Sequence, residues 1–387
     1  MSPNDPPPST AGNPGRLKVL CVFGTRPEAI KMAPVIAELR RDADRFLCRV
    51  CVTHQHRELL DDVLRLFDIV PDHDLNVMRQ AQSPAYVTAA VLTGLEAVLA
   101  EEQPHWILVQ GDTSTTMAAS LAAFYQRVKV GHVEAGLRTG DKWRPFPEEI
   151  NRRVVTLVAD RHFAPTPGAR QNLLREGVPE AAVLVTGNTV IDALLDVSQR
   201  PFDWEASALA GVPANGKRLI LVTAHRRESF GAPMQSICEA LLDIARGHRD
   251  SVHIVLPIHL NPRVAKPLKA RLGGVENISL LQPLDYLSLA HLMKRLFLVL
   301  TDSGGIQEEA PSLGVPVLVL REVTERPEAV AAGVAKLVGT DYDRIVREAN
   351  RLLEDKSEHD RMARAVNPYG DGLASKRIVR ALLEHGA

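Results

Sequence analysis

The stretch LFLVLTDSGGIQEEAPSLGVPVLVL, residues 296–320, is the part of the sequence that decides the fold. It begins and ends with apolar runs, which we predict to be the strands Leu296–Thr301 and Val315–Leu320, and a glycine-led helical segment lies between them. Runs this apolar are typical of strands in a parallel sheet, because helices cover both of its faces. The stretch therefore predicts one unit of a doubly wound α/β sheet.

The same alternation of apolar runs and amphipathic stretches continues through most of the 387 residues. The other predicted strands are Leu17–Phe23, Phe46–Thr53, Trp106–Gln110, Lys129–Glu134, Arg161–Ala164, Val183–Thr186, Arg218–Thr223, Val252–Pro257 and Ile278–Leu281. Helical patterns between them include Glu28–Arg40, Thr116–Tyr125 and Glu148–Ala159. A chain of this length suggests two domains, and we expect them at residues 17–186 and 187–374, after a disordered, proline-rich leader at residues 1–16.

Composition excludes several classes of function. Lysine plus arginine is 46 and aspartate plus glutamate is 47, so the chain lacks the positive charge of a nucleic-acid binder. No run of 18 apolar residues is present, which argues against a membrane span, and the leader lacks the apolar core of a secretory signal. Four cysteines are too few for a disulfide scaffold and fit a reducing compartment, so we expect a cytoplasmic protein.

In open parallel sheets, ligands bind beyond the carboxyl ends of the strands, so the residues that follow each strand are the informative ones. After the first strand, Gly24 permits a tight turn, and Arg26 and Lys31 follow near the start of a helix. These two cations either contact a diphosphate or lie on a solvated helix surface.

Three carboxylates follow neighbouring strands or begin the next helix. Asp112 could cap a helix, but Thr113 and Ser114 can do this instead, which leaves its carboxylate for the cleft. Glu134 closes a buried strand and is either paired with Arg138 or catalytic. Glu148 lies in a first helical turn, where the helix dipole also favours it. Together they could supply the base and the acids of a proton-transfer reaction.

The second half of the chain carries the signals for an anion. Bare backbone amides at Ser303, Gly304 and Gly305 could hold a diphosphate at a helix start, and Glu309 could accept hydrogen bonds from ribose hydroxyls. His225 follows another strand, beside two arginines, as an acid/base or a phosphate contact. His259 ends the next strand. The sequence contains no GxGxxG motif, so we expect no nicotinamide cofactor, and no convincing set of metal ligands.

The chain resembles the non-hydrolysing UDP-N-acetylglucosamine 2-epimerases over nearly everything after the leader. The resemblance rests on long motifs in order: 24–36, 55–61, 111–126, 131–153, 187–194, 223–231, 259–264, 301–314 and 325–330. It implies a GT-B arrangement of two Rossmann-like domains with the active site between them, and a C-terminal helix at about 375–387 that crosses back to the first domain. It also implies a homodimer that needs neither cofactor nor metal.

The reaction that the resemblance implies interconverts UDP-N-acetylglucosamine and UDP-N-acetylmannosamine through a 2-acetamidoglucal intermediate, with UDP kept in the cleft, and supplies sugars for cell-surface polysaccharide. Carried over by motif, the acid/base carboxylates are Asp112, Glu134 and Glu148, with His225 beside the diphosphate. The residues at the substrate are Arg26, Lys31, Ser303, Gly304, Gly305 and Glu309. The residues that match the family's site for a second, activating substrate are Gln55, His56, Gln82, Arg226 and His259.

Two positions depart from the family's pattern. Leu289, with Tyr286 nearby, stands where an aromatic ring often packs against uracil, and Ala81 stands where activated members carry an arginine. Other functions remain open: the same chemistry on another UDP-2-acetamido sugar such as a 2,3-diacetamido uronic acid, a hydrolysing epimerase that releases UDP, a GT-B glycosyltransferase, or a UDP-sugar sensor without turnover.

Overall fold

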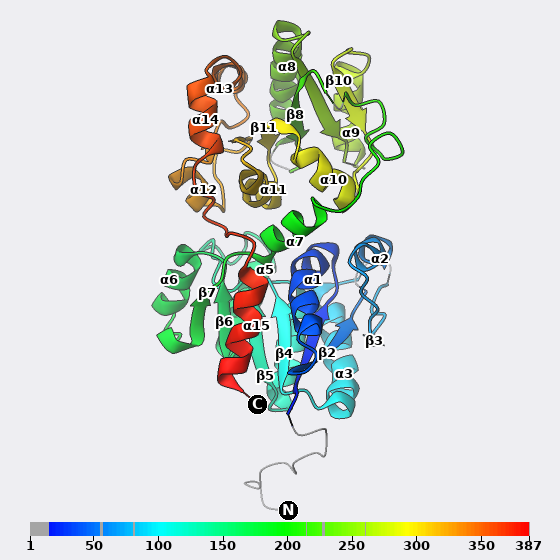
Figure 1. Cartoon of the computed structure of the whole chain (residues 1–387), viewed down its shortest axis with the longest axis vertical. Helices are drawn as coiled ribbons and strands as arrows, with labels where there is room; N and C mark the ends of the chain where they lie inside the picture. The colour runs from blue at the N-terminus through cyan, green and yellow to red at the C-terminus, as the bar shows by residue number, and fades with distance from the viewer. Residues whose placement is uncertain are drawn as a thin grey trace, which may run out of the picture.

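The computed structural model describes residues 15–54, 57–79, 82–213, 215–226, 229–259 and 261–386, and of residues 57–59 it describes the backbone alone. Two parallel sheets, each between layers of helices, form two lobes stacked along the long axis of the molecule (Figure 1). The predicted doubly wound α/β fold with two sheets is thus confirmed. The predicted leader lies outside the described residues except for Gly15 and Arg16.

The first sheet has the strand order β3-β2-β1-β4-β5-β6-β7, and all of its neighbouring strands pair in parallel. Its strands are β1 (Leu17–Phe23), β2 (Phe46–Val52), β3 (His73–Asp74), β4 (Trp106–Gln110), β5 (Lys129–Val133), β6 (Arg161–Ala164) and β7 (Val183–Val185). The side chains of β1 alternate between two cores: Val19 and Cys21 pack on one face, Leu20 and Val22 on the other.

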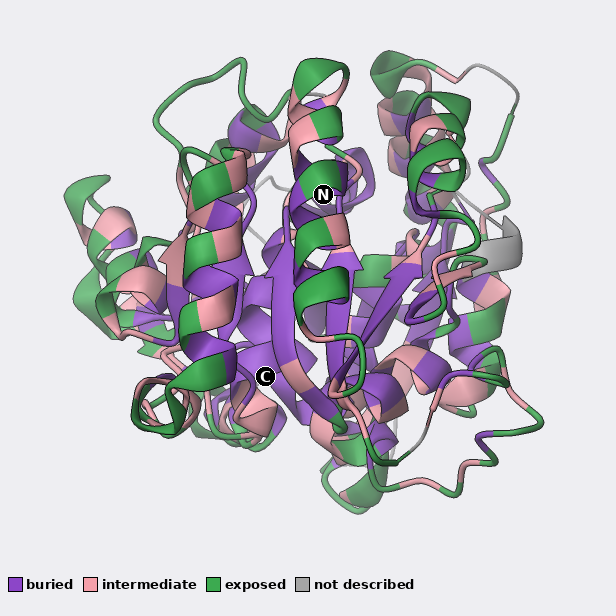
Figure 2. Cartoon of the chain, turned by 90° about the horizontal axis from the view of Figure 1, so that it is seen from above, coloured by how far each residue is buried: buried purple, intermediate pink, exposed green. Residues whose placement is uncertain are grey.

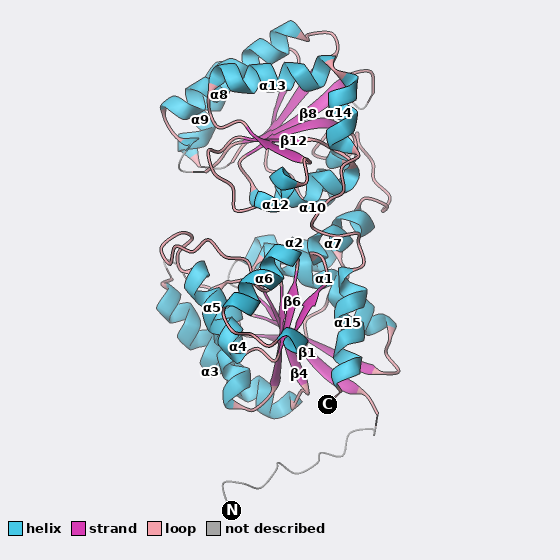
Figure 3. Ribbon diagram, turned by 90° about the vertical axis from the view of Figure 1, so that its left-hand side faces the viewer, coloured by secondary structure: helices cyan, strands magenta, loops and turns pink. Residues whose placement is uncertain are grey.

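Helices cover both faces of this sheet (Figure 3). In the two lobes the outer sides of the helices are exposed, whereas the strands are buried (Figure 2). On the Val19 face lie α1 (Arg26–Arg41), α2 (Arg57–Leu66), α7 (Thr189–Val197) and α15 (Ala374–His385). On the other lie α3 (Pro84–Glu102), α4 (Ser114–Tyr125) and α5 (Glu148–Val158). At the β6–β7 edge lie α6 (Pro167–Arg175) and the short η1 (Glu180–Ala182). No helix of the described chain is long and apolar enough to cross a membrane.

The second sheet has the order β10-β9-β8-β11-β12-β13, again with parallel pairing. Its strands are β8 (Arg218–Thr223), β9 (Val252–Pro257), β10 (Ile278–Leu281), β11 (Leu296–Thr301), β12 (Val317–Val319) and β13 (Ala335–Leu337). Its helices are α8 (Ala232–Gly247), α9 (Pro262–Leu272), α10 (Tyr286–Met293), α11 (Gly304–Glu309), η3 (Ala310–Leu313), α12 (Pro327–Ala331), α13 (Tyr342–Glu354) and α14 (Lys356–Ala363).

The chain passes between the lobes twice, before α7 and before α15, which returns to pack on α1 (Figure 1). The apolar core on the α1 side continues through α7 into the second lobe, where it includes Leu219 and Val299. Because one core serves both lobes, the carboxyl ends of the two sheets are held facing one another.

Candidate active site

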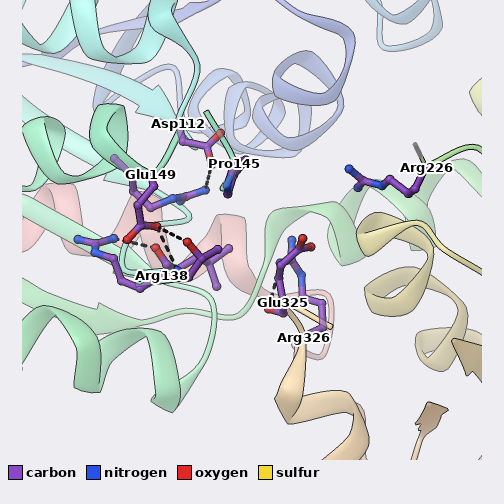
Figure 4. A pocket seen from close by; sticks show the side chains of 10 residues that line it. Asp112, Arg138, Pro145, Glu149, Arg226, Glu325 and Arg326 are labelled. Carbon is purple, nitrogen blue, oxygen red and sulfur yellow. Dashed lines mark hydrogen bonds and ion pairs between the residues drawn. The ribbon is translucent and has the colours of Figure 1, made fainter. Parts of the chain in front are cut away.

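A cavity of about 150 Å³ lies between the two lobes and takes its walls from both (Figure 4). Its lining residues are Asp112, Leu137, Arg138, Thr139, Pro145, Glu149, Arg152, Arg226, Glu325 and Arg326. Asp112 comes from the carboxyl end of the first sheet, and Arg226 from that of the second. The cavity therefore lies where ligands bind in sheets of this kind.

Glu134 lies directly after β5 in a left-handed backbone conformation, with φ of 61°, which is costly for a residue with a side chain. Its buried carboxylate pairs with the Lys31 ammonium, and Arg152 Nη2 lies 3.6 Å from Oε1. Burial by itself raises the pKa of Glu134, but these two cations outweigh it and lower the pKa to about 2. Glu134 is therefore ionised throughout the physiological range.

One of the two predicted alternatives for Glu134, an ion pair with Arg138, is wrong. Arg138 Nη2 instead donates to the Glu176 carboxylate at 2.7 Å and to the Thr156 hydroxyl at 2.9 Å. The loop after β5 turns Arg138 toward α6, whereas Arg152, one turn into α5, reaches back to the strand end. Sequence spacing favours the nearer arginine, and the tertiary fold selects the more distant one.

Asp112 accepts a hydrogen bond from Arg152 Nη2 at 2.5 Å, so a single guanidinium connects it to Glu134. The N-cap of α4 is Thr113, whose hydroxyl accepts from the Thr116 N–H at 3.1 Å. The expectation that the helix does not need Asp112 as a cap is confirmed, and the Asp112 carboxylate lines the cavity.

Glu148, the first residue of α5, lines a neighbouring cavity of about 300 Å³ together with Gln82, Thr113 and Asn151. Its Oε2 atom is buried without a hydrogen-bond partner among the described residues. Burial, with the nearby charge of Asp112, raises the pKa of Glu148. Glu148 therefore holds a proton to a higher pH than Glu134 does.

The structure separates the two predicted cations of the first helix. Lys31 forms an ion pair with Glu134 in the interior of the protein. Burial alone would lower the pKa of Lys31, but the charges of Glu134 and Glu308 raise it. Arg26 reaches across to the second lobe, where Nη2 donates to the Leu284 carbonyl at 3.4 Å. Arg26 also lines a third cavity, of about 450 Å³, together with Tyr286.

Glu28 was not among the predicted site residues, although it is fully buried at the base of the site. Its carboxylate accepts from the Gly24 and Thr25 N–H groups at 3.0 and 2.8 Å, and from the Thr113 and Thr116 hydroxyls at 2.6 and 3.0 Å. It thus joins the turn after β1 to the turn after β4. A glutamate three residues after a threonine at a helix start is the sequence signal for this role.

On the second lobe, Ser303, Gly304 and Gly305 lie at the start of α11, as predicted. A Cβ atom on Gly304 would make an ordinary van der Waals contact with Arg326 Nη2 at 3.6 Å, so this guanidinium lies beside the start of α11. Glu309 accepts a hydrogen bond from the Tyr286 hydroxyl at 3.1 Å. Its burial, together with the charge of Glu308, raises the pKa of Glu309 to about 7.

His225 is held at the end of β8 by Asp302, a fully buried residue that was not predicted. The backbone N–H groups of His225 and Arg226 donate to Asp302 Oδ2 at 2.6 and 2.7 Å, and His225 Nδ1 lies 3.2 Å from Oδ1. The His225 ring stacks on that of His259, with centroids 5.6 Å apart. Burial lowers the pKa of His225.

The residues proposed for a second substrate molecule are only partly placed. Gln55, His56 and the neighbouring Ala81 lie outside the described residues. Gln82 lines the cavity of Glu148, whereas Arg226 and His259 are exposed on the second lobe. Their grouping as one site stays a prediction.

Position 289, where the family often has an aromatic ring, carries a partly buried leucine that packs against the apolar core on the α1 side. No group of three or more His, Cys, Asp or Glu side chains that could hold a metal ion is present in the described part of the chain.

Comparison with known proteins gives a consistent result. The family model for UDP-N-acetylglucosamine 2-epimerase matches residues 37–383. The UDP-N-acetylglucosamine 2-epimerase of Escherichia coli K12 is 56% identical over 371 residues, which covers 95% of this chain and 98% of that protein.

Solved structures agree with the sequence match. The 2-epimerase from Neisseria meningitidis, solved with UDP-GlcNAc bound, has a TM-score of 0.86 and 48% identity, and the match covers 95% of this chain and all of that one. The UDP-GlcNAc 2-epimerase from Methanocaldococcus jannaschii, in complex with UDP-GlcNAc and UDP, has a TM-score of 0.78 and 34% identity, and the match covers 96% of this chain and all of that one. With these matches over nearly its whole length, the chain belongs to the UDP-N-acetylglucosamine 2-epimerase family.

Proposed function

We propose that this protein catalyses the reversible C2 epimerisation of UDP-N-acetylglucosamine to UDP-N-acetylmannosamine, without hydrolysis and without a cofactor or metal. The observation that carries the proposal is the set of three carboxylates, Asp112, Glu134 and Glu148, at one edge of the first sheet. Their environments differ: the pKa of Glu134 is lowered to about 2, whereas that of Glu148 is raised. Such a divergence is typical of sites where one group accepts a proton and another donates it.

The proposed reaction is an elimination followed by an addition. A carboxylate takes the proton from C2, the C1–O bond to UDP breaks, and the electron pair of the C2–H bond forms the C1=C2 double bond of 2-acetamidoglucal. A second carboxyl group then returns a proton to the opposite face of C2, and a phosphate oxygen of UDP re-forms the bond to C1. The cavity between the lobes suits this sequence because UDP and the glucal must stay together while water is excluded.

The second lobe is proposed to hold UDP. His225 and the amides of Ser303, Gly304 and Gly305 face the diphosphate, and the carboxylate of Glu309 accepts from the ribose. Arg226, Gln82 and His259 are proposed to contact a second UDP-GlcNAc molecule. The relatives from Neisseria meningitidis and Methanocaldococcus jannaschii, both solved with UDP-GlcNAc, support this class of ligand.

We also propose a cytoplasmic homodimer that supplies N-acetylmannosamine-type sugars for polysaccharide. Four free cysteines support a reducing compartment. The adjacent helices α4 and α5 expose apolar side chains, and the exposed fractions are 56% for Phe124, 65% for Tyr125 and 85% for Leu157. A second copy covering this face would bury them. Sedimentation of a Leu157→Glu variant as a monomer, beside a wild-type dimer, would support this assembly.

Proton NMR of the purified protein with UDP-GlcNAc in deuterium oxide, without added metal or nicotinamide, tests the activity. The expected result is UDP-N-acetylmannosamine that carries deuterium at C2. Accumulation of free UDP and N-acetylmannosamine would show a hydrolysing enzyme. An unchanged spectrum from folded protein that binds UDP would refute the proposed substrate, and other UDP-2-acetamido sugars would be profiled next.

A further inference from the structure

The side chain of Asn188 lies between the two lobes and contacts a carboxylate from each. Its Nδ2 atom donates to Glu134 Oε2 at 3.1 Å in the first lobe and to Glu308 Oε2 at 2.7 Å in the second. All three side chains are buried, with exposed fractions of 2%, 6% and 1% respectively. Asn188 belongs to the motif at residues 187–194, which contains none of the residues proposed for substrate binding or proton transfer.

Asn188 also stands where the two crossings of the chain touch. Its backbone N–H donates to the Tyr369 carbonyl at 2.7 Å. The preceding Gly187 has φ of 88°, and a Cβ atom there would lie 3.1 Å from the Cα atom of Gly370. Four residues further along α7, Asp192 accepts from the Ser375 N–H at 2.8 Å and so holds the start of α15. The motif therefore builds the connection between the lobes.

An asparagine suits this position better than any other residue type that caps helices. Its amide group carries two N–H bonds, one for each carboxylate, while Oδ1 accepts from the Val190 N–H at 3.3 Å and caps α7. An aspartate would cap α7 equally well, but it would place a third carboxylate against the other two. A serine would also cap the helix and would remove both amide donors.

We propose that Asn188 is a positioning residue for Glu134: it ties this carboxylate to Glu308 of the second lobe, so that the orientation of Glu134 depends on how the lobes are arranged. The inference rests on the proposed function of Glu134. Glu308 is itself held by Arg326, so the connection extends from the carboxyl end of β5 through Asn188 to the base of the second lobe. Asn188 contacts no reacting atom of the proposed epimerisation and acts through Glu134.

The variants Asn188→Asp and Asn188→Ser test the inference, because both keep a helix cap and both lose the amide donors. We expect kcat for epimerisation to fall about 100-fold in each, as for a misplacement of about 1 Å in a reacting group. KM should rise less than about threefold, because substrate binding does not need this contact. The matched control is Asp341→Asn, which exchanges an exposed cap of α13 whose carboxylate accepts from the Arg344 N–H, and it should keep wild-type kcat.

A double variant separates positioning from an independent role. In the Glu134→Gln background, Asn188→Ser should change the residual rate by less than about twofold, because effects that act through one group are not additive. Should Asn188→Asp fail to fold, the neutral Asn188→Ser still decides. Wild-type kcat in either folded variant, or a multiplied loss in the double variant, would overturn the inference. An inactive wild-type protein would instead refute the proposed function, and this inference with it.

Discussion

Replacing Lys31 by methionine should destabilise the protein strongly at neutral pH and weakly in acid. Lys31 belongs to a largely buried network in which three cations face three carboxylates, so the charges balance, and Asp112 at its edge is 28% exposed. The members are Lys31, Arg152 and Arg326, and Asp112, Glu134 and Glu308. Methionine preserves the length and the apolar stem of Lys31 but leaves the network with one uncompensated negative charge.

Two routes give the size of the effect. Removing one partner of a buried ion pair costs about 3–5 kcal/mol, because the other charge remains buried and unpaired. As a second measure, burial and the charges of Lys31, Arg152 and Arg326 together lower the pKa of Glu134 from 4.5 to about 2, a net effect of about 3.5 kcal/mol at about 1.4 kcal/mol per unit, to which Lys31 contributes most among the cations. For a domain of this size, 1 kcal/mol shifts Tm by about 2–4 °C, so Lys31→Met should lower Tm by about 10 °C at pH 7.

The dependence on pH follows from the direction of the shift. Because folding lowers the pKa of Glu134, its pairing contributes fully above pH 4.5 and is lost as the pH falls toward 2. The difference in Tm between wild type and Lys31→Met should therefore shrink between pH 5 and pH 3. Differential scanning fluorimetry over this range measures it. The double variant Lys31→Met/Glu134→Gln, which removes both charges, should recover most of the lost Tm.

The matched control is Lys356→Met, which breaks an exposed pair with Asp360 in which the Lys356 side chain is 84% accessible. Exposed pairs contribute about 0–1 kcal/mol, so its Tm should change by less than about 3 °C. If Lys31→Met lowers Tm by less than about 3 °C at pH 7, or if the double variant does not recover the lost Tm, the charges of the network do not depend on one another as argued.

Three further outcomes follow from the site. Glu134→Gln should lower turnover by several powers of ten, whereas its affinity for UDP, measured by calorimetry, should stay nearly unchanged. Near-normal turnover would show that Glu134 has no role in the mechanism. The pKa of Glu309 is raised to about 7, and in the proposed complex ribose hydroxyls donate to its ionised form. Uridine should therefore bind more tightly as the pH rises from 6 to 8, and Glu309→Gln should abolish this trend. A uridine affinity of the wild type that does not change with pH would contradict the contact between Glu309 and the ribose. Gly24→Ala would place a Cβ atom 2.0 Å from the Thr53 hydroxyl, and should lower both Tm and turnover; an unperturbed Tm would show that the turn can shift at little cost.

Most of the fold was predictable because each buried parallel strand is a continuous apolar run, and β1, β4, β6, β8, β9, β10 and β11 have the predicted bounds. The strands β3 and β13 were missed. They have two and three residues at the sheet edges, and their hydrogen bonds are determined by the neighbouring strands rather than by their own composition. The predicted strand Val315–Leu320 is shorter in the structure, at Val317–Val319, because the pairing with β11 and β13 covers only its centre.

The site divides in the same way. Asp112 and Glu134 could be selected from the sequence, since each follows a strand and the carboxyl ends of parallel strands meet at one edge. Arg152, Asn188 and Glu308 could not, although each lies inside or beside a motif that the resemblance singled out. Their importance depends on contacts between segments that are 40 to 120 residues apart.

Glu134 shows why the ion-pair partners of a buried carboxylate are hard to predict from the sequence, even where the carboxylate itself can be predicted. A carboxylate at a strand end needs a cation, and sequence alone offers the nearest one, Arg138. Burial makes the requirement stricter, because an unmatched charge there is costly whereas a surface charge is not. The fold meets it with Lys31 from α1 and Arg152 from α5, and Arg138 is left to pair with Glu176. Charge balance is thus a property of elements that converge in space, so it appears in the sequence only as scattered residues.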